Sequence, residues 1–297
     1  MSQVIVVGCG YVGARVAAAE RDRGARVLCL VRRAESAAGL RRRSLDAHAG
    51  DLDEPPAPST LPSAGALIYY FAPPPPTGLV DSRLGGLLAA IPSGAAPRRV
   101  VLISTTGVYG DCGGAWVDES RPPAPQAERA HRRLDAERRL STWCTDNEVQ
   151  WVILRVPGIY GPGRLPRERL RAGTPVLAEA ASPWSNRIHV DDLVTASLMA
   201  GHNPDAGGVY NVGDGRPSTM TDYFNRVADA LGVPRPPQLD AREAERQLSA
   251  GIRSYLAESK RIDNRRMREE LGVVLQYPDL SAGLAQCVAE ERNPHTD

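Results

Sequence analysis

The architecture of the chain follows from one short stretch, VIVVGCGYVG, at residues 4–13. Four apolar residues that read as a buried strand lead into Gly8, Gly10 and Gly13 in GxGxxG register, and a helical stretch follows at 14–23. The first two glycines permit a tight turn and a close approach of the backbone to a pyrophosphate, and the third permits close helix packing. The helix N-terminus attracts the anion. The stretch predicts dinucleotide binding, with Tyr11 and Val12 in the same site; the alternative is a glycine-rich turn without a ligand.

The strand pattern recurs along the first half of the chain. Apolar stretches at 4–7, 26–31, 66–71, 99–104 and 150–156 alternate with helical stretches. This alternation is typical of a doubly wound parallel sheet with helices on both faces, so we predict an α/β fold. Beyond Gly158 the alternation weakens, and short helices are expected at 190–201, 221–231 and 263–271, which indicates a smaller second lobe.

Composition narrows the class of protein further. The 36 basic and 35 acidic residues nearly cancel, which argues against binding to nucleic acid or to an anionic membrane surface. The five cysteines are widely spread and lack CxxC spacing, so we expect neither a disulfide framework nor a metal site. No apolar run reaches membrane-spanning length and the N-terminus does not resemble a signal peptide, so we expect a soluble cytoplasmic protein.

The end of the second predicted strand bears on the choice of cofactor. An NAD-selective site usually carries Asp or Glu there to bind the ribose 2′-hydroxyl. Here the chain reads Val31, Arg32, Arg33, and two guanidiniums suit a 2′-phosphate. This pattern favours NADP over NAD; the alternative is that both arginines begin a solvated loop. Asp51 and Leu52, after the next short strand, are expected to contact the adenine.

Further motifs give the chain a family resemblance. They are GDL (50–52), YYFAPPPPTG (69–78), STTGVYGD (104–111), LRVPGIYGPGR (154–164), NRIHVDDL (186–193) and YNVGDGRP (210–217). With the glycine loop, they resemble the extended short-chain dehydrogenase/reductase family, in its NAD(P)-dependent epimerase/dehydratase branch of sugar-nucleotide enzymes. The resemblance implies a Rossmann domain over 1–162, with 186–213 returning to it, and a mainly substrate-binding lobe over 163–297. It adds Ala72, Arg133 and Pro157 to the cofactor site.

The same resemblance implies a Ser or Thr that bonds the reacting oxygen, and this role falls on Thr105; the alternative is a Thr that caps a strand end. It also implies a Tyr-x-x-x-Lys pair on the next helix. Aligned on LDAE (134–137), the helix carries Arg129 at the tyrosine position and Arg133 at the lysine position. Lys260 is the only lysine and Leu256 lies four residues before it, so the motif occurs nowhere in the chain.

The missing phenol leaves the proton donor open. A guanidinium stays protonated in proteins, so Arg129 can bind or polarise an oxygen but is a poor general acid or base. His131, Tyr109, Tyr160 and water held by Thr105 are the alternatives, although His131 fits a solvated helix face as well. Asp191 and Asp192 are expected to cap the next helix rather than bind a metal.

The substrate end is assigned by resemblance. It places Tyr109, Arg187 and Arg261 around the substrate, with Arg187 facing a phosphate or carboxylate, while an exposed basic helix start is the alternative for Lys260 and Arg261. The leading hypothesis is an NADP-dependent oxidoreductase or epimerase-like enzyme acting on a nucleotide sugar or another small polar alcohol or ketone. The alternative is a catalytically silent NADP-binding sensor or partner subunit. Related proteins often form dimers, so a homodimer is expected.

Overall fold

The computed structural model describes residues 1–54 and 61–292. Within these residues the central element is a sheet of seven parallel strands in the order β12-β7-β5-β4-β1-β2-β3. The strands are β1 (Gln3–Val7), β2 (Arg26–Val31), β3 (Asp46–Ala49), β4 (Leu67–Tyr70), β5 (Arg99–Thr105), β7 (Gln150–Val156) and β12 (Gly208–Asn211). The predicted doubly wound parallel sheet is confirmed. The strand order reverses direction between β1 and β4, and this is where an open α/β sheet forms its ligand crevice.

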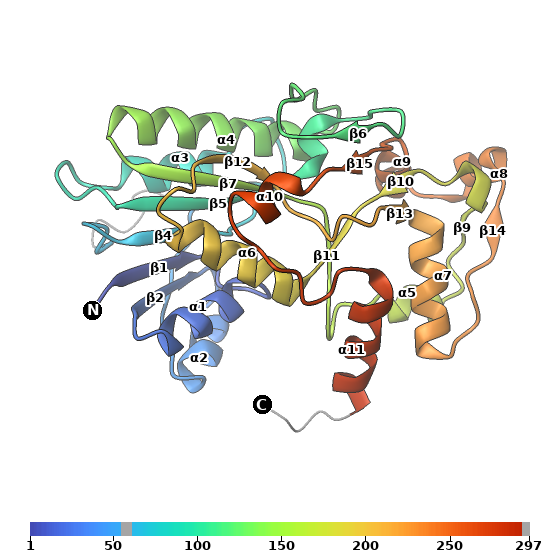
Figure 1. The fold of residues 1–297 in the computed structure, drawn as a ribbon, viewed down its shortest axis with the longest axis horizontal. Helices are drawn as coiled ribbons and strands as arrows, with labels where there is room; N and C mark the ends of the chain where they lie inside the picture. The colour runs from blue at the N-terminus through green and yellow to red at the C-terminus, as the bar shows by residue number, and fades with distance from the viewer. Residues whose placement is uncertain (55–60, 293–297) are drawn as a thin grey trace.

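Helices cover both faces of the sheet (Figure 1). On one face lie α1 (Gly13–Asp22), α2 (Ala34–Arg42) and α6 (Val190–His202), and on the other lie α3 (Ser82–Ala89) and α4 (Glu128–Asp146). Strand β1 shows how the sequence serves both faces: Val4 and Val6 join the core under α1 and α6, whereas Ile5 and Val7 join the core under α3 and α4. A strand buried on both faces reads as a continuous apolar run, which is the pattern seen in the sequence.

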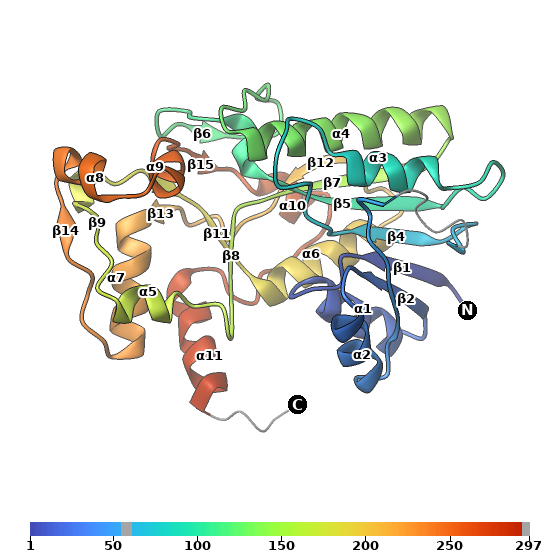
Figure 2. The same ribbon diagram turned by 180° about the vertical axis from the view of Figure 1, so that it is seen from behind.

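A smaller lobe stands beyond the carboxyl ends of the strands, as the view from behind shows (Figure 2). It contains four two-stranded pairings and several short helices. The pairings are β8 (Gly158–Tyr160) with β11 (Arg187–His189), β9 (Val176–Leu177) with β14 (Gln238–Leu239), β10 (Trp184–Ser185) with β13 (Ser218–Thr219), and β6 (Trp116–Val117) with β15 (Arg261–Ile262). The helices are α5 (Arg167–Arg171), α7 (Met220–Leu231), α8 (Ala241–Gln247), α9 (Ala250–Leu256) and α11 (Leu280–Arg292), with the 3-10 turn η2 (Glu179–Ala181). Helix α10 (Arg265–Glu269) lies at the edge of the central sheet instead, and the 3-10 turn η1 (Thr106–Tyr109) packs against α4.

The chain crosses between the two lobes more than once. After β11 it forms α6, which packs on the sheet beside α1, and β12 then pairs with β7 at the edge of the sheet. Helix α10 packs against β12 from the C-terminal part of the chain. Of the helices expected beyond Gly158, α6 and α7 match the predicted ranges closely, α10 is shorter than predicted, and α11 was not predicted. Among the described residues no helix is both long and apolar enough to cross a membrane.

A buried ion pair fixes α4 against the sheet. Arg155 on β7 donates from Nη2 to Glu137 Oε2 on α4 at 2.7 Å and from Nε to Oε1 at 3.1 Å, and both side chains are about 5% exposed. Ser104, at the end of β5, donates to the same carboxylate at 2.5 Å. Because Thr105 follows Ser104 directly, this pair holds α4 in register with the strand end that carries the predicted hydroxyl.

We expect Glu137→Ala to lower the free energy of unfolding by about 3–5 kcal/mol, because it leaves the Arg155 charge buried without its carboxylate. Asp229→Ala is the matched control, since Asp229 pairs with Arg235 on the surface, and it should leave the denaturation midpoint unchanged. Urea denaturation followed by circular dichroism measures both. Equal midpoints for the two variants would show that the buried pair does not stabilise the fold.

Candidate cofactor and substrate cleft

The glycine loop lies at the carboxyl ends of β1 and β4. Gly8 has a φ of 87°, and a Cβ there would lie 2.3 Å from the backbone nitrogen of Ala72 after β4. A Cβ on Gly13 would lie 2.7 Å from the carbonyl oxygen of Gly8. A Cβ on Gly10 would meet nothing within 4 Å. Gly8 and Gly13 are therefore required by packing, whereas Gly10 leaves open space where a pyrophosphate would approach.

This open space belongs to a cavity of about 1180 Å³ at the crevice between β1 and β4. The predicted cofactor residues that line it are Gly8, Gly10, Tyr11, Val12, Gly13, Arg32, Arg33, Asp51, Leu52, Ala72 and Arg133. Pro157 does not line it; its ring lies beside Gly213 instead. Helix α1 begins at the cavity. The N–H groups of Ala14 and Arg15 bond to the carbonyls of Gly10 and Val12, but no side chain caps the N-terminus, so no side chain occupies the place that an anion would take there. The residues present therefore fit a dinucleotide.

The far end of the cavity is basic. Arg32 and Arg33 follow β2, and Nε of Arg32 lies 3.3 Å from Oδ2 of Asp51. Arg33 is the N-cap residue of α2, and no side chain caps that helix. Ser36, in the first turn of α2, also lines the cavity. Two guanidiniums, a hydroxyl and an open helix N-terminus thus surround the position that follows β2.

Of the two residues expected to meet the reacting groups, Arg133 lines the opposite end of the cavity and Thr105 does not line it. Arg133 lines the cavity and donates from Nη1 to the carbonyl of Ala72 at 3.3 Å, and burial lowers the pKa of its guanidinium. Thr105 is half-buried, and its Oγ1 accepts from the N–H of Gly107 at 3.1 Å. The capping alternative is therefore observed. Since the hydroxyl accepts in that bond, its own proton remains available to donate to another oxygen.

Arg129 does not join Arg133 in the cavity. Its Nη1 donates to Oγ of Ser254 at 2.8 Å, and its Nη2 lies 3.5 Å from Oε1 of Glu258. Both partners belong to the C-terminal lobe, so α4 is bridged to that lobe at the position where the resemblance implies a tyrosine. His131, on the same helix, is half-buried and does not line the cavity.

The two tyrosines considered as proton donors are both internal. Tyr109 is 1% exposed, its hydroxyl donates to Oδ1 of Asn211 at 2.8 Å, and the guanidinium of Arg155 lies over its ring. Tyr160 is fully buried and its hydroxyl bonds the carbonyl of Asp279 at 3.4 Å; burial raises the pKa of both tyrosines. Tyr109 is buried and does not line the cavity, and its contact with the substrate stays a prediction.

Arg187, which was expected to contact the substrate, is buried and does not line the cavity. Its guanidinium lies over the ring of Tyr223 and donates to the carbonyl of Asn186 at 2.8 Å, and burial lowers its pKa. Asp214 lies nearby, and burial raises the pKa of its carboxyl group to about 7. The positive charge of Arg187 opposes this rise. These two groups form a buried basic and acidic pair at the base of the C-terminal lobe.

Arg261 lies on the surface of the same lobe. Its Nε donates to the carbonyl of Gly114 at 2.7 Å, and its guanidinium lies 5.4 Å and 5.1 Å from the ring centroids of Trp116 and Trp184. Lys260, its neighbour in sequence, points the opposite way and is 5% exposed. The alternative of an exposed basic helix start is therefore wrong for Lys260, because its side chain is buried just before β15 and its Nζ pairs with Oε2 of Glu258 at 2.6 Å.

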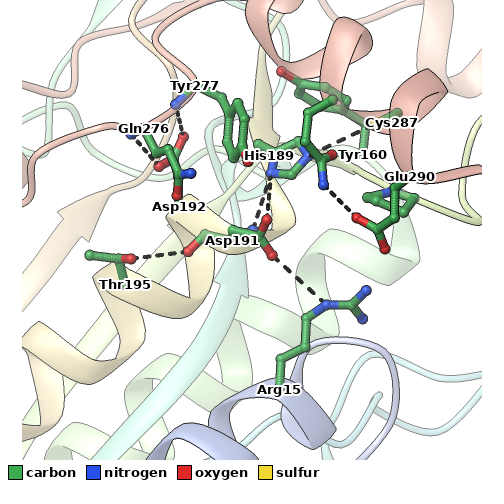
Figure 3. A network of polar contacts seen from close by, with 12 residues as sticks. Arg15, Tyr160, His189, Asp191, Asp192, Thr195, Gln276, Tyr277, Cys287 and Glu290 are labelled. Carbon is green, nitrogen blue, oxygen red and sulfur yellow. Dashed lines mark hydrogen bonds and ion pairs between the residues drawn. The ribbon is translucent and has the colours of Figure 1, made fainter. Parts of the chain in front are cut away.

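Figure 3 shows the junction between α6, β8 and the C-terminal segment. His189, not an aspartate, caps α6: its Nδ1 accepts from the N–H of Asp191 at 3.3 Å, and its Nε2 therefore donates to Oε1 of Gln286 at 3.2 Å. Burial lowers the pKa of His189 and favours this neutral form. Asp192 accepts instead from the N–H groups of Gln276 and Tyr277. The prediction that Asp191 and Asp192 cap the helix is wrong, because the preceding residue, His189, accepts the hydrogen bond from the N–H of Asp191.

Several residues that line the cleft were not predicted, among them Ser36 and Arg83. Ser36 follows a strand and two arginines, a context that could have indicated a phosphate contact. Arg83 lines the cavity and donates to Asp53 and to the carbonyl of Pro73, and no local pattern marks it. Its role depends on a contact between segments that are far apart in sequence.

Comparison with known proteins agrees with this geometry. The family model described as the NAD dependent epimerase/dehydratase family matches residues 86–213. Protein YeeZ of Escherichia coli (strain K12) is 28% identical over 294 residues, which cover 94% of this chain and 97% of YeeZ. A UDP-glucose 4-epimerase of Mycolicibacterium smegmatis is 28% identical over 211 residues, covering 67% of this chain and 64% of the epimerase. A solved structure of a functionally unknown conserved protein from Silicibacter pomeroyi DSS is 30% identical with a TM-score of 0.84, covering 99% and 100% of the two chains.

The chain belongs to the NAD-dependent epimerase/dehydratase family of the extended short-chain dehydrogenases/reductases. The predicted family and the NAD(P)-binding Rossmann fold are confirmed. The comparisons also support the general class that was expected, an NAD(P)-dependent enzyme that modifies sugars.

The glycine loop yields a direct test of the cofactor site. We expect Gly10→Ala to leave the melting temperature unchanged, because its Cβ meets nothing within 4 Å, and to weaken NADPH binding at least about tenfold by filling the space for the pyrophosphate. Gly8→Ala should instead destabilise the fold, since its Cβ would overlap the backbone at Ala72. Differential scanning fluorimetry and NADPH fluorescence titration separate the two effects. Unchanged NADPH affinity in Gly10→Ala would place the pyrophosphate elsewhere.

Proposed function

We propose that the protein is an NADP-dependent oxidoreductase or epimerase-like enzyme that acts on a nucleotide sugar or a related small polar alcohol or ketone. The observation that carries the choice of cofactor is the basic end of the cavity. Arg32, Arg33 and the open N-terminus of α2 lie where a 2′-phosphate would stand, and no carboxylate directly follows β2. Asp51 already pairs with Arg32, and a dianionic phosphate would compete for the same guanidinium.

The rest of the cofactor has residues to hold it. The N-terminus of α1 and the backbone beside Gly10 are placed to hold the pyrophosphate, and Leu52 the adenine. Arg133 has the position and charge to hold ribose hydroxyls in place of the family's lysine. When bound, the nicotinamide supplies or accepts hydride. Thr105 supplies a hydroxyl proton that can bond the reacting oxygen, and its own orientation is set by the N–H of Gly107.

The sugar-nucleotide class is supported by the likeness to a UDP-glucose 4-epimerase over 67% of the chain. A catalytically silent NADP-binding protein is the second candidate, because Arg129 stands at the tyrosine position and is held by the C-terminal lobe. Turnover separates the two candidates, whereas cofactor binding does not.

Replacing both Arg32 and Arg33 by Ala should weaken NADPH much more than NADH. One charge-assisted hydrogen bond contributes about 1.5–3 kcal/mol, which is roughly tenfold or more in affinity for each arginine lost. Fluorescence titration with both cofactors gives the ratio. Equal weakening of NADPH and NADH would show that neither arginine contacts the 2′-phosphate.

Thr105→Ala should reduce turnover on the order of a hundredfold, because it removes a donor to the reacting oxygen, while NADPH affinity stays unchanged. Thr195→Ala is the matched control, since Thr195 is exposed on α6 and bonds only the carbonyl of Asp191 in this structure. NADPH oxidation or isomer exchange is followed with nucleotide sugars and small ketones. Full activity in Thr105→Ala would remove the hydroxyl from the mechanism, and no turnover in any variant or in the parent would favour the silent candidate.

A further inference from the structure

One carboxylate bridges two cations at the substrate side of α4. Oε1 of Glu258 lies 3.5 Å from Nη2 of Arg129, and Oε2 of the same group lies 2.6 Å from Nζ of Lys260. The two cations come from distant parts of the chain, one from α4 and the other from the residue before β15. Each oxygen of one planar group thus faces its own cation. We call Arg129, Glu258 and Lys260 the carboxylate cluster.

Two members of the cluster are buried and the third is partly exposed. The side chains of Lys260 and Glu258 are 7% and 10% exposed, and that of Arg129 is 34% exposed. The backbone of Lys260 donates to the carbonyl of Trp184 at 3.4 Å and accepts from Nδ2 of Asn186 at 3.0 Å. Arg129 is held by α4 and by Ser254. Glu258 and Lys260 lie in the same segment between α9 and β15, whose backbone is anchored by these bonds, so the Glu258 carboxylate can leave the cations by rotation of its own side chain.

The cluster adjoins the loop that follows Thr105. Asp111 in that loop accepts from the N–H of Ser259 at 2.8 Å, and Cys112 donates to the carbonyl of Ser259 at 3.0 Å. Ser259 stands between Glu258 and Lys260. The segment that carries the cluster is thus attached to the chain immediately beyond η1, which begins next to Thr105.

We propose that Arg129 and Lys260 form a subsite for a carboxylate of the substrate, and that Glu258 occupies this subsite as an internal competitor in the free protein. The inference rests on the proposed function and narrows its substrate to nucleotide sugars that carry a carboxylate, as uronic acids do. A guanidinium cannot serve as the acid or base that tyrosine supplies, but it binds carboxylates well. The replacement of tyrosine by Arg129 therefore exchanges a proton-transfer position for an anion-binding one.

The charges of the cluster determine whether it binds a carboxylate or a neutral group of the substrate. When a substrate carboxylate displaces Glu258, one charged partner replaces another and both cations stay paired. A neutral hydroxyl in the same place would leave the buried Lys260, beside the partly exposed Arg129, without the negative charge of Glu258, which is costly for the buried lysine. Sites built for a charged or polar group discriminate strongly against ligands that lack it. The cluster therefore selects for the acid over its neutral analogue.

The first test measures binding of UDP-glucuronic acid and UDP-glucose to the NADPH-loaded protein by calorimetry. The parent should prefer UDP-glucuronic acid, and Glu258→Gln should bind it about tenfold more tightly than the parent does, because the competitor is gone. Lys260→Met should abolish the preference. Glu270→Gln is the matched control, since Glu270 pairs with Arg266 at an exposed site, and it should change neither affinity. Equal affinity of the parent for both ligands, or weaker binding of UDP-glucuronic acid to Glu258→Gln, would overturn the proposal.

The second test needs neither nucleotide nor turnover. Acetate should raise the melting temperature of Glu258→Ala above that in an equal concentration of chloride, by refilling the place of the lost carboxylate, and should not do so for the Glu258→Ala/Lys260→Met double variant. No acetate effect in Glu258→Ala would overturn the subsite. NADPH titration on the same preparations distinguishes failure of the subsite from failure of the proposed function. NADPH binding without acetate rescue would contradict the carboxylate subsite alone. Acetate rescue without NADPH binding would contradict the proposed cofactor alone.

Discussion

The cleft depends on the close contact between the backbones at the ends of β1 and β4. Gly8 approaches Phe71 and Ala72 so closely that a side chain would not fit, and this contact fixes where the strand order of the sheet reverses. The start of α1, the carbonyl of Ala72 that Arg133 contacts, and the cavity between them all take their positions from it. The dinucleotide end of the protein is thus determined by a constraint on backbone packing, and the side chains only select which cofactor fits.

At the substrate end, the structure depends on how buried charges are compensated. Buried charges there are numerous, and each cation is paired, stacked on an aromatic ring, or bonded to a carbonyl. Glu137 and Arg155 lock α4 to the sheet, whereas Arg129 on the same helix reaches across to the C-terminal lobe. One helix therefore carries both a structural ion pair and the residue that replaces the family's tyrosine. The ion pair holds α4 against the sheet independently of the residue that faces the other lobe.

The sequence predicted those parts of the molecule that depend on local pattern. The central strands are continuous apolar runs, and the glycine spacing encodes a backbone turn, so both are visible without a structure. Side-chain direction in irregular segments does not follow from local sequence. Tyr109 is the last residue of the 3-10 turn η1 and bonds to Asn211, and the motif around it does not show which way its side chain points. The contact of Arg129 with Glu258 joins residues far apart in the chain and was invisible for the same reason. His189 as the cap of α6 was missed because Asp and Asn are the usual capping residues.

The central claim is that the cavity beside the glycine loop binds a dinucleotide, although Arg129 stands where the family resemblance implies a tyrosine. Calorimetric titration of the purified protein with NADPH tests this claim most directly. The expected result is saturable binding at one site per chain, with a Kd of order micromolar, within the range in which enzymes commonly bind their small-molecule partners. Absence of saturable binding at about millimolar NADPH, in protein shown to be folded, would contradict the assignment of the cavity.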